Sequence, residues 1–268
     1  MSRIFPEHRW SSEVETYFVR DKCALFASVL LEGLAGDYFS HIKMNQLDYG
    51  PGGDDLLIEA MAALALHAAS RPWTESFAWT IHFEEPLRNV FVCADNALGR
   101  ITGTVFLEDV KKLGSNLFHS QVVSPHYEPR SSFIEFSDSQ ILDAVEEYFE
   151  RSEQRLARLF RTDALQYVMV QAQPDCDLEW LTGLQSEDAQ EIKRRLELSR
   201  LETRGFSFYC GCDDGRMMDF LLPLMREKPE ELFAGESALR MRCPRCGRRH
   251  LITREALEAR LAEKNRSI

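Results

Sequence analysis

The feature that most constrains this 268-residue chain is a set of four cysteines near its C-terminal end. Cys210 and Cys212 form a Cys-x-Cys pair, Cys243 and Cys246 form a Cys-x-x-Cys pair, and thirty residues separate the two pairs. A buried structural cysteine usually packs alone as a small hydrophobe, so two close pairs need another explanation. Two chelating pairs joined by a loop predict one tetrahedral site in which four thiolates bind zinc. Without metal, the same thiols can instead form two short-range disulfides.

Each cysteine pair carries a neighbouring glycine. Gly247 follows Cys246, and Gly211 separates Cys210 from Cys212. Gly247 permits the positive φ that turns the backbone back, and Gly211 relieves the steric limit on the narrow Cys-x-Cys bite. The four cysteines complete the site, so we assign His250 to a neighbouring strand.

Five arginines crowd the second cysteine pair, and their positive field favours thiolate over thiol. They are Arg240, Arg242, Arg245, Arg248 and Arg249. A phosphate-binding patch is the alternative interpretation of this cluster. The other three cysteines are isolated in sequence. We expect Cys23 and Cys93 in the core and Cys176 in an exposed linker, with no chemistry assigned to any of them.

Composition narrows the class of protein. Apolar content of 44% and charged content of 28% are ordinary for a soluble globular chain. No apolar run reaches the roughly 18 residues of a membrane span, and the start lacks a signal-peptide core. We therefore expect a cytoplasmic protein, where thiols stay reduced and spaced cysteine pairs bind metal. The net charge of −11 is uneven: residues 206–268 carry 12 Lys+Arg and 10 Asp+Glu, so the first 205 residues are strongly acidic, which argues against nucleic-acid binding.

The pattern along the chain predicts an α+β fold with an N-terminal core domain of antiparallel sheet and helices over residues 1–173. Residues 55–69 are almost all apolar and predict a buried helix, with Asp54 as its cap and His67 as a core histidine. Short β-type runs punctuated by Pro and Gly follow from residue 77 to 136 and predict an antiparallel sheet.

Two further segments complete the predicted core domain. Ser137 to Gln140 match a capping box, and the helix that they open is expected to run to about Arg161. Residues 165–172 return to strand character.

Residues 186–204 are densely charged with a thin apolar stripe, which predicts that residues 174–205 form a marginally stable helical linker or, alternatively, an ordinary surface helix. A small zinc-binding domain then covers residues 206–268. In it we expect a helix that Pro223 ends or kinks, and a last helix capped by Thr253. Such a small module buries too little to fold alone, so zinc has to contribute to its stability.

These residues resemble those of the heat-shock protein 33 family of redox-regulated chaperones. The resemblance rests on the two cysteine pairs at their separation, on YFERSEQ at residues 148–154, and on the opening Phe18-Val19-Arg20. The order of elements is similar over nearly the whole chain. The linker is shorter than is usual in the family, so its unfolding would expose less surface for binding other proteins.

The resemblance implies an ATP-independent holdase and no enzyme. In the reduced form zinc is bound and activity is weak. Peroxide or hypochlorite then oxidises the cysteines, expels zinc and leaves disulfides Cys210–Cys212 and Cys243–Cys246. The resemblance further implies that the loosened linker binds unfolding client proteins and that the active protein is commonly a homodimer.

Two other functions remain open at this point. One is a divergent relative in which the zinc is purely structural. The other is a zinc ribbon that binds nucleic acid through the arginine cluster, which the acidic body disfavours. A thioredoxin-like oxidoreductase is disfavoured, because the cysteine pairs of this chain lack the strand-to-helix context of a thioredoxin-like motif.

Overall fold

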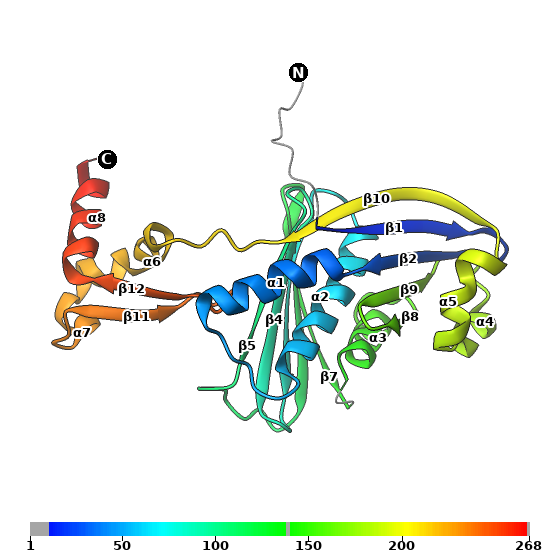
Figure 1. The fold of residues 1–268 in the computed structure, drawn as a ribbon, viewed down its shortest axis with the longest axis horizontal. Coiled ribbons are helices and arrows are strands. Elements are labelled where there is room, and N and C mark those ends of the chain that lie inside the picture. Colours follow the sequence, from blue (N-terminus) through cyan, green and yellow to red (C-terminus); the bar gives the residue numbers. More distant parts are fainter. Residues whose placement is uncertain (1–10, 138–139, 267–268) are drawn as a thin grey trace, which may run out of the picture.

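The computed structural model describes residues 11–137 and 140–266, and its main feature is one ten-stranded sheet (Figure 1). Its strands follow the order β7-β6-β3-β4-β5-β10-β1-β2-β9-β8. Their bounds are β1 (Ser12–Val19), β2 (Ala24–Leu30), β3 (Ser76–Phe83), β4 (Arg88–Asp95), β5 (Arg100–Phe106), β6 (Asn116–Ser124), β7 (Tyr127–Phe136), β8 (Ala157–Asp163), β9 (Gln166–Ala172) and β10 (Leu198–Phe208). Apart from the short parallel contact of β10 with β5, neighbouring strands run antiparallel, as the sequence predicted.

Helices line the sheet and the C-terminal part of the chain. Their bounds are α1 (Glu32–Asn45), α2 (Gly53–Ala69), α3 (Ile141–Arg151), α4 (Leu178–Gly183), α5 (Ser186–Arg195), α6 (Asp214–Glu227), α7 (Pro229–Phe233) and α8 (Arg254–Arg266), with a short 3-10 turn η1 (Arg20–Lys22). A separate hairpin pairs β11 (Ala238–Arg242) with β12 (Arg249–Thr253). Among the described residues, no helix is long and apolar enough to cross a membrane.

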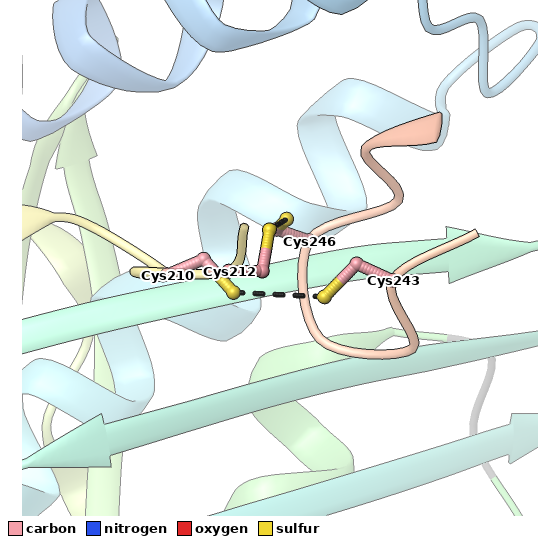
Figure 2. Close-up of side chains that lie close together, drawn as sticks. All are labelled: Cys210, Cys212, Cys243 and Cys246. Carbon is pink, nitrogen blue, oxygen red and sulfur yellow. Dashed lines mark hydrogen bonds between the residues drawn. The ribbon is translucent and has the colours of Figure 1, made fainter. Parts of the chain in front are cut away.

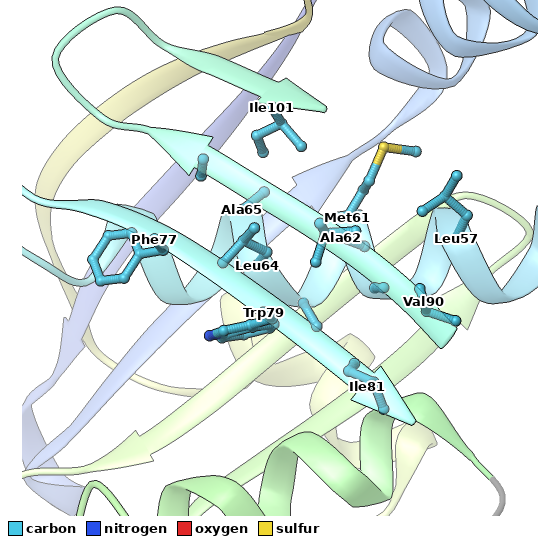
Figure 3. Packing of buried hydrophobic residues seen from close by; sticks show 14 of the residues in the cluster. Leu57, Met61, Ala62, Leu64, Ala65, Phe77, Trp79, Ile81, Val90 and Ile101 are labelled. Atoms are coloured by element: carbon cyan, nitrogen blue, oxygen red, sulfur yellow. The ribbon is translucent and has the colours of Figure 1, made fainter. Parts of the chain in front are cut away.

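Helix α2 forms the centre of the core, as its continuous apolar sequence predicted. Its residues pack against β3, β4 and β5, with Met61 and Leu64 close to Trp79 and Ile101 (Figure 3). The predicted cap is wrong. The N-cap is Gly52, which adopts a positive φ of 72°, and the Asp54 side chain instead accepts a hydrogen bond from the Tyr38 hydroxyl.

The helix predicted to run to Arg161 ends ten residues earlier, at Arg151. The chain turns after it, with Gln154 at a positive φ of 53°, and residues from Ala157 form β8 against β9. Apolar residues in this stretch fit a helix and a strand about equally, and the ladder with β9 decides between them. The capping box is also wrong: Gln140, and not Ser137, is the N-cap, while residues 138–139 lie outside the described residues.

The linker is helical only in its first part. Helices α4 and α5 pack through Leu181 and Ile192 in a second apolar cluster over β2, β8 and β9. From Leu198 onward the chain forms a strand, β10, which pairs with β1 and then with β5. Its partner strand β1 lies almost the whole chain away in sequence, so the local charge density could not predict the pairing. The predicted functional boundaries at 174 and 206 remain predictions.

Helices α6 to α8 and the β11–β12 hairpin form a small C-terminal module at the end of β10 (Figure 1). Helix α6 continues through Pro223 to Glu227, so this proline does not end it. The predicted cap of α8 is confirmed, since the Thr253 hydroxyl accepts a hydrogen bond from the amide of Ala256 at 3.2 Å.

Candidate metal centre

Two short segments bring the four cysteines together. Cys210 and Cys212 follow directly after the end of β10, and Cys243 and Cys246 lie in the turn between β11 and β12. Their sulfur atoms all lie within 4.8 Å of one another (Figure 2). The Sγ atoms of Cys210 and Cys243 are 3.7 Å apart, and those of Cys212 and Cys246 are 3.5 Å apart. All four thiols are free and can together hold a metal ion.

The predicted turn at Gly247 is confirmed, and Gly211 also has a positive φ. Gly211 adopts a φ of 70° and Gly247 a φ of 74°. The turn around the second pair is closed by two backbone bonds, from Cys243 to the carbonyl of Arg248 at 2.8 Å and from Gly247 to the carbonyl of Cys243 at 2.9 Å. This turn directs both sulfurs of the pair to the same side, where Cys210 and Cys212 meet them.

The four thiols share their charge unequally. Hydrogen bonds from the thiols of Cys210 and Cys246 lower the pKa of Cys243 strongly, and nearby backbone amides add to the effect. Burial and the neighbouring Cys210 charge raise the pKa of Cys212 to about 12. Four thiolates this close repel one another without a cation between them, so the cluster favours binding a positive ion.

The arginines contribute through specific contacts. Arg245 donates a hydrogen bond to the Cys93 sulfur in β4 at 3.1 Å, and Arg248 donates to the carbonyl of Cys212 at 3.4 Å. The lowered pKa of Cys243 comes mainly from sulfur and backbone donors, so the predicted guanidinium field is not its chief cause. Arg245 therefore fixes the cysteine turn to the core sheet.

The cysteine turn is seated directly on the core domain. His41 of α1 donates from Nε2 to the carbonyl of Cys246 at 2.9 Å. A side chain at Gly247 would lie 2.7 Å from the Tyr49 hydroxyl and 2.8 Å from Oγ1 of Thr104. Only a glycine fits this contact without displacing its neighbours. The centre is thus a junction between the module and the core.

His250 lies in β12 as predicted, and its buried ring faces α6. Its Nδ1 atom is 2.7 Å from a carboxylate oxygen of Asp214, the first residue of α6. The contact ties the hairpin to α6 and places this histidine outside the cysteine cluster.

The burial of the three remaining cysteines agrees with the prediction for two of them and differs for Cys23. Cys93 is buried, as predicted, and Cys176 is partly exposed. Cys23 is only partly buried and ends the η1 turn at a positive φ of 46°, so its assignment to the core is wrong. Sequence reasoning missed His41 and Cys93 at the metal centre, because their contacts join segments about 150 to 205 residues apart.

A family model described as Hsp33 protein matches residues 36–253 of this chain. The chain belongs to the Hsp33 family. Hsp33 relatives named 33 kDa chaperonin are similar to it in sequence. The protein from Photorhabdus laumondii is 24% identical over 267 residues, which cover 87% of this chain and 92% of that protein. The one from Actinobacillus succinogenes is 24% identical over 249 residues, which cover 80% and 86%.

The Hsp33 fold is also shared with a solved structure. The crystal structure of the 33 kDa chaperonin from Thermotoga maritima superposes with a TM-score of 0.71 at 17% identity, covering 96% of this chain and 99% of that one. The predicted α+β fold and the predicted family are therefore confirmed.

Proposed function

We propose that this Hsp33 chain is a redox-regulated holdase that binds unfolding proteins without ATP and without catalysis. In the proposal, Cys210, Cys212, Cys243 and Cys246 hold one zinc ion in the reduced, weakly active form. Oxidation of the thiolates releases zinc and activates binding. The single observation that carries the proposal is that the four-sulfur cluster lies where the end of β10 meets the core.

The donor set and its spacing support zinc. Zinc bonds of about 2.3 Å to four sulfurs in a tetrahedron set each sulfur–sulfur edge at about 3.8 Å. The two closest sulfur pairs are 3.5 and 3.7 Å apart, and the widest separation stays within 4.8 Å. A zinc ion at this centre would neutralise part of the thiolate charge and cross-link the end of β10 to the β11–β12 turn. Four soft thiolates also disfavour Mg²⁺ and Ca²⁺, which prefer oxygen ligands.

Loss of the metal would act first on the end of β10. Phe208 is nearly buried, and its ring packs against Tyr38 at 5.6 Å and His41 at 5.1 Å. His41 also holds the carbonyl of Cys246. When oxidation pulls the cysteines into new pairings, this contact with the core loses its support, and Phe208 becomes free to leave.

Strand β10 occupies a position from which its release would expose a large apolar surface. It lies between β5 and β1 and so joins the two halves of the sheet. Its pairing with β5 covers two residues, Ser207 and Phe208, next to the cysteines. Detachment would uncover a sheet edge on each side and the buried Phe206, which are surfaces that unfolding clients can pair with and cover.

The remaining details of the proposal follow the family resemblance. They are disulfides Cys210–Cys212 and Cys243–Cys246 in the oxidised form, a homodimer as the active species, and a reducing compartment such as the cytoplasm. In the reduced cluster, Cys210 lies close to Cys243 and Cys212 lies close to Cys246, so each thiol has a near neighbour in the other segment. The disulfide pairing therefore has to be measured in the oxidised protein.

A peroxide titration of the zinc-loaded protein tests the proposal. Zinc release, free thiols, disulfide pairing and suppression of client light scattering are measured in the same samples. We expect about one zinc per chain at the start and a rise in scattering suppression that follows zinc release. An oxidised, zinc-free protein that leaves client aggregation unchanged would rule out the switch.

A second candidate, a purely structural zinc, is favoured by the packing of β10. The strand is eleven residues long and carries Arg204 with only 2% of its surface exposed, so it is not the marginal linker that the sequence predicted. If the protein suppresses aggregation equally with and without oxidant while keeping its zinc, the structural role is correct.

A further inference from the structure

A second pair of thiols, Cys23 and Cys176, lies far from the metal centre. Cys23 follows η1 at the start of β2, and Cys176 opens the segment that leads into α4. Both side chains are partly exposed, in contrast to the buried Cys93. Neither has a part in the function proposed above.

Backbone hydrogen bonds hold the two cysteines next to each other. The amide of Gln173 donates to the carbonyl of Cys23 at 3.1 Å, which extends the β2–β9 ladder by one residue. The chain then makes a tight turn in which the amide of Cys176 donates to the carbonyl of Gln173 at 3.1 Å. The amide of Asp177 next donates to the carbonyl of Lys22 at 3.2 Å. Cys176 is therefore anchored beside Cys23 on both sides.

These bonds bring the Cα atoms of the two cysteines close to disulfide range. Standard backbone lengths added to the bond from Asp177 to Lys22 limit the Cα–Cα separation of the two cysteines to about 8 Å. A disulfide needs roughly 4.4–6.8 Å, so a small movement of the turn is enough. Pro174 and Asp175 at the turn tip are exposed, which allows this movement. Burial raises the pKa of the Cys176 thiol, followed by the Asp177 carboxylate and then the neighbouring Cys23.

We propose that Cys23 and Cys176 form a second redox site that closes to a disulfide with hydrogen peroxide. One thiol attacks the peroxide and gives a sulfenic acid and one water. The second thiol then displaces the hydroxyl from that sulfur, forming the S–S bond and a second water. The two thiols lose two electrons and two protons in total, and these reduce one peroxide to two waters.

The position of this pair decides what the disulfide does. Asp177 caps α4 by accepting a hydrogen bond from Trp180 at 3.0 Å, and it forms an ion pair with Lys22 at 2.7 Å. The new bond would lock this start of the linker to β2. The two thiol sites lie at opposite ends of β10, with α4 and α5 at one end and the cysteine cluster at the other (Figure 1). The disulfide thus sets a fixed limit on how far the linker can unfold.

Burial raises the pKa of the Cys176 thiol. Less of this thiol is ionised at neutral pH than in an ordinary cysteine, so it reacts slowly with peroxide.

Mass spectrometry of the intact, zinc-loaded protein after peroxide treatment tests the proposal. Free thiols are blocked before digestion, and peptides cross-linked through Cys23 and Cys176 are counted against the dose. We expect this cross-link in more than half of the monomeric chains at the highest dose, and its loss in Cys23→Ser and in Cys176→Ser. Zinc release should be unchanged in both variants, which separates this site from the metal centre.

A second measurement reports the consequence. Limited proteolysis between α4 and β10 should be slower in the oxidised wild-type protein than in the oxidised Cys176→Ser variant. If Cys23 and Cys176 remain reduced, become singly oxidised, or cross-link only between chains, the second site does not exist. Loss of zinc release with an intact Cys23–Cys176 cross-link would instead contradict the switch and leave this proposal standing.

Discussion

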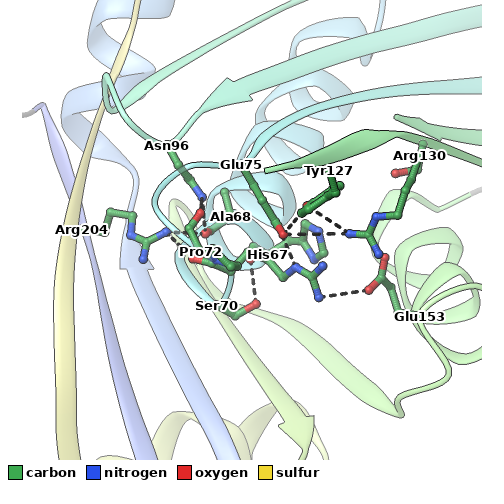
Figure 4. A network of polar contacts seen from close by, with 12 residues as sticks. His67, Ala68, Ser70, Pro72, Glu75, Asn96, Tyr127, Arg130, Glu153 and Arg204 are labelled. Atoms are coloured by element: carbon green, nitrogen blue, oxygen red, sulfur yellow. Dashed lines mark hydrogen bonds and ion pairs between the residues drawn. The ribbon is translucent and has the colours of Figure 1, made fainter. Parts of the chain in front are cut away.

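The buried guanidinium of Arg204 in β10 donates a 2.7 Å hydrogen bond to the carbonyl of Ala68 in the last turn of α2 (Figure 4). The same nitrogen donates to the carbonyl of Arg71 at 2.8 Å, and the guanidinium lies 4.2 Å from the centre of the Trp73 ring. A cation at a helix C-terminus satisfies carbonyls that have no partner within the helix. Arg204 therefore fastens the linker strand to the central helix of the core.

Replacing this residue should loosen β10. For Arg204→Met we expect a loss of about 3 kcal/mol in the free energy of unfolding, because the buried carbonyl of Ala68 and the partly buried carbonyl of Arg71 lose a charged donor. The variant should also reach full client binding at lower peroxide. Chemical denaturation and a peroxide titration measure the two effects. Arg200→Met on the same strand is the matched control, since Arg200 is exposed and its removal should change stability by less than about 0.5 kcal/mol.

Removing one ligand should release the metal. Cys246→Ser leaves three thiolates and a hydroxyl, a poorer donor for zinc, so we expect well under one zinc per chain after dialysis. The C-terminal module should then become sensitive to protease. Cys176→Ser is the control, because this thiol lies outside the cluster and should leave zinc content unchanged. Full zinc occupancy in Cys246→Ser would exclude Cys246 as a ligand.

The contact between the cysteine turn and the core can be tested at Gly247. In Gly247→Ala the new methyl group meets Tyr49 and Thr104 at a positive φ, so the turn has to lift from the core. We expect a lower melting temperature and earlier zinc release with peroxide. Gly235→Ala carries the same backbone strain, at a φ of 87°, with no atom within 4 Å of the added carbon. Equal effects in both variants would mean that the strain of about 1 kcal/mol, and not the contact, is responsible.

The buried His67 should make the core sensitive to acid. Burial lowers its pKa from 6.5 to about 3, and within the described residues neither ring nitrogen has a hydrogen-bond partner. Between pH 6.5 and 3 the unfolded chain binds a proton at this residue and the folded chain does not. Stability therefore falls as the pH is lowered through this window, by up to about 1.4 kcal/mol for each pH unit.

The comparison with His67→Leu isolates this effect. The variant should lose stability less steeply than the wild-type protein between pH 6.5 and 4, as measured by denaturant unfolding at each pH. His126→Leu, at an exposed position, should follow the wild-type curve. Parallel curves for His67→Leu and the wild-type protein would show that the histidine is protonated in the folded state.

Local sequence signals predicted those parts of the fold that depend on neighbouring residues. The continuous apolar run of α2, the strands of the antiparallel sheet and the glycine turn after Cys246 all appear as expected. The errors lie where a segment fits two structures. Residues 157–163 became a strand through pairing with β9, and residues 198–208 became a strand through pairing with β1.

The sequence by itself determined the family, the α+β class and the four thiols that can share one metal. Motifs, hydrophobic patterns and cysteine spacing are all properties of residues that are close together along the chain. Only the tertiary structure decided what this cluster touches. His41, Tyr49 and Cys93 meet the cysteine turn through contacts across the whole chain, and Arg204 meets α2 in the same way. Such contacts depend on how distant strands pair and pack, and no local pattern of residues records that.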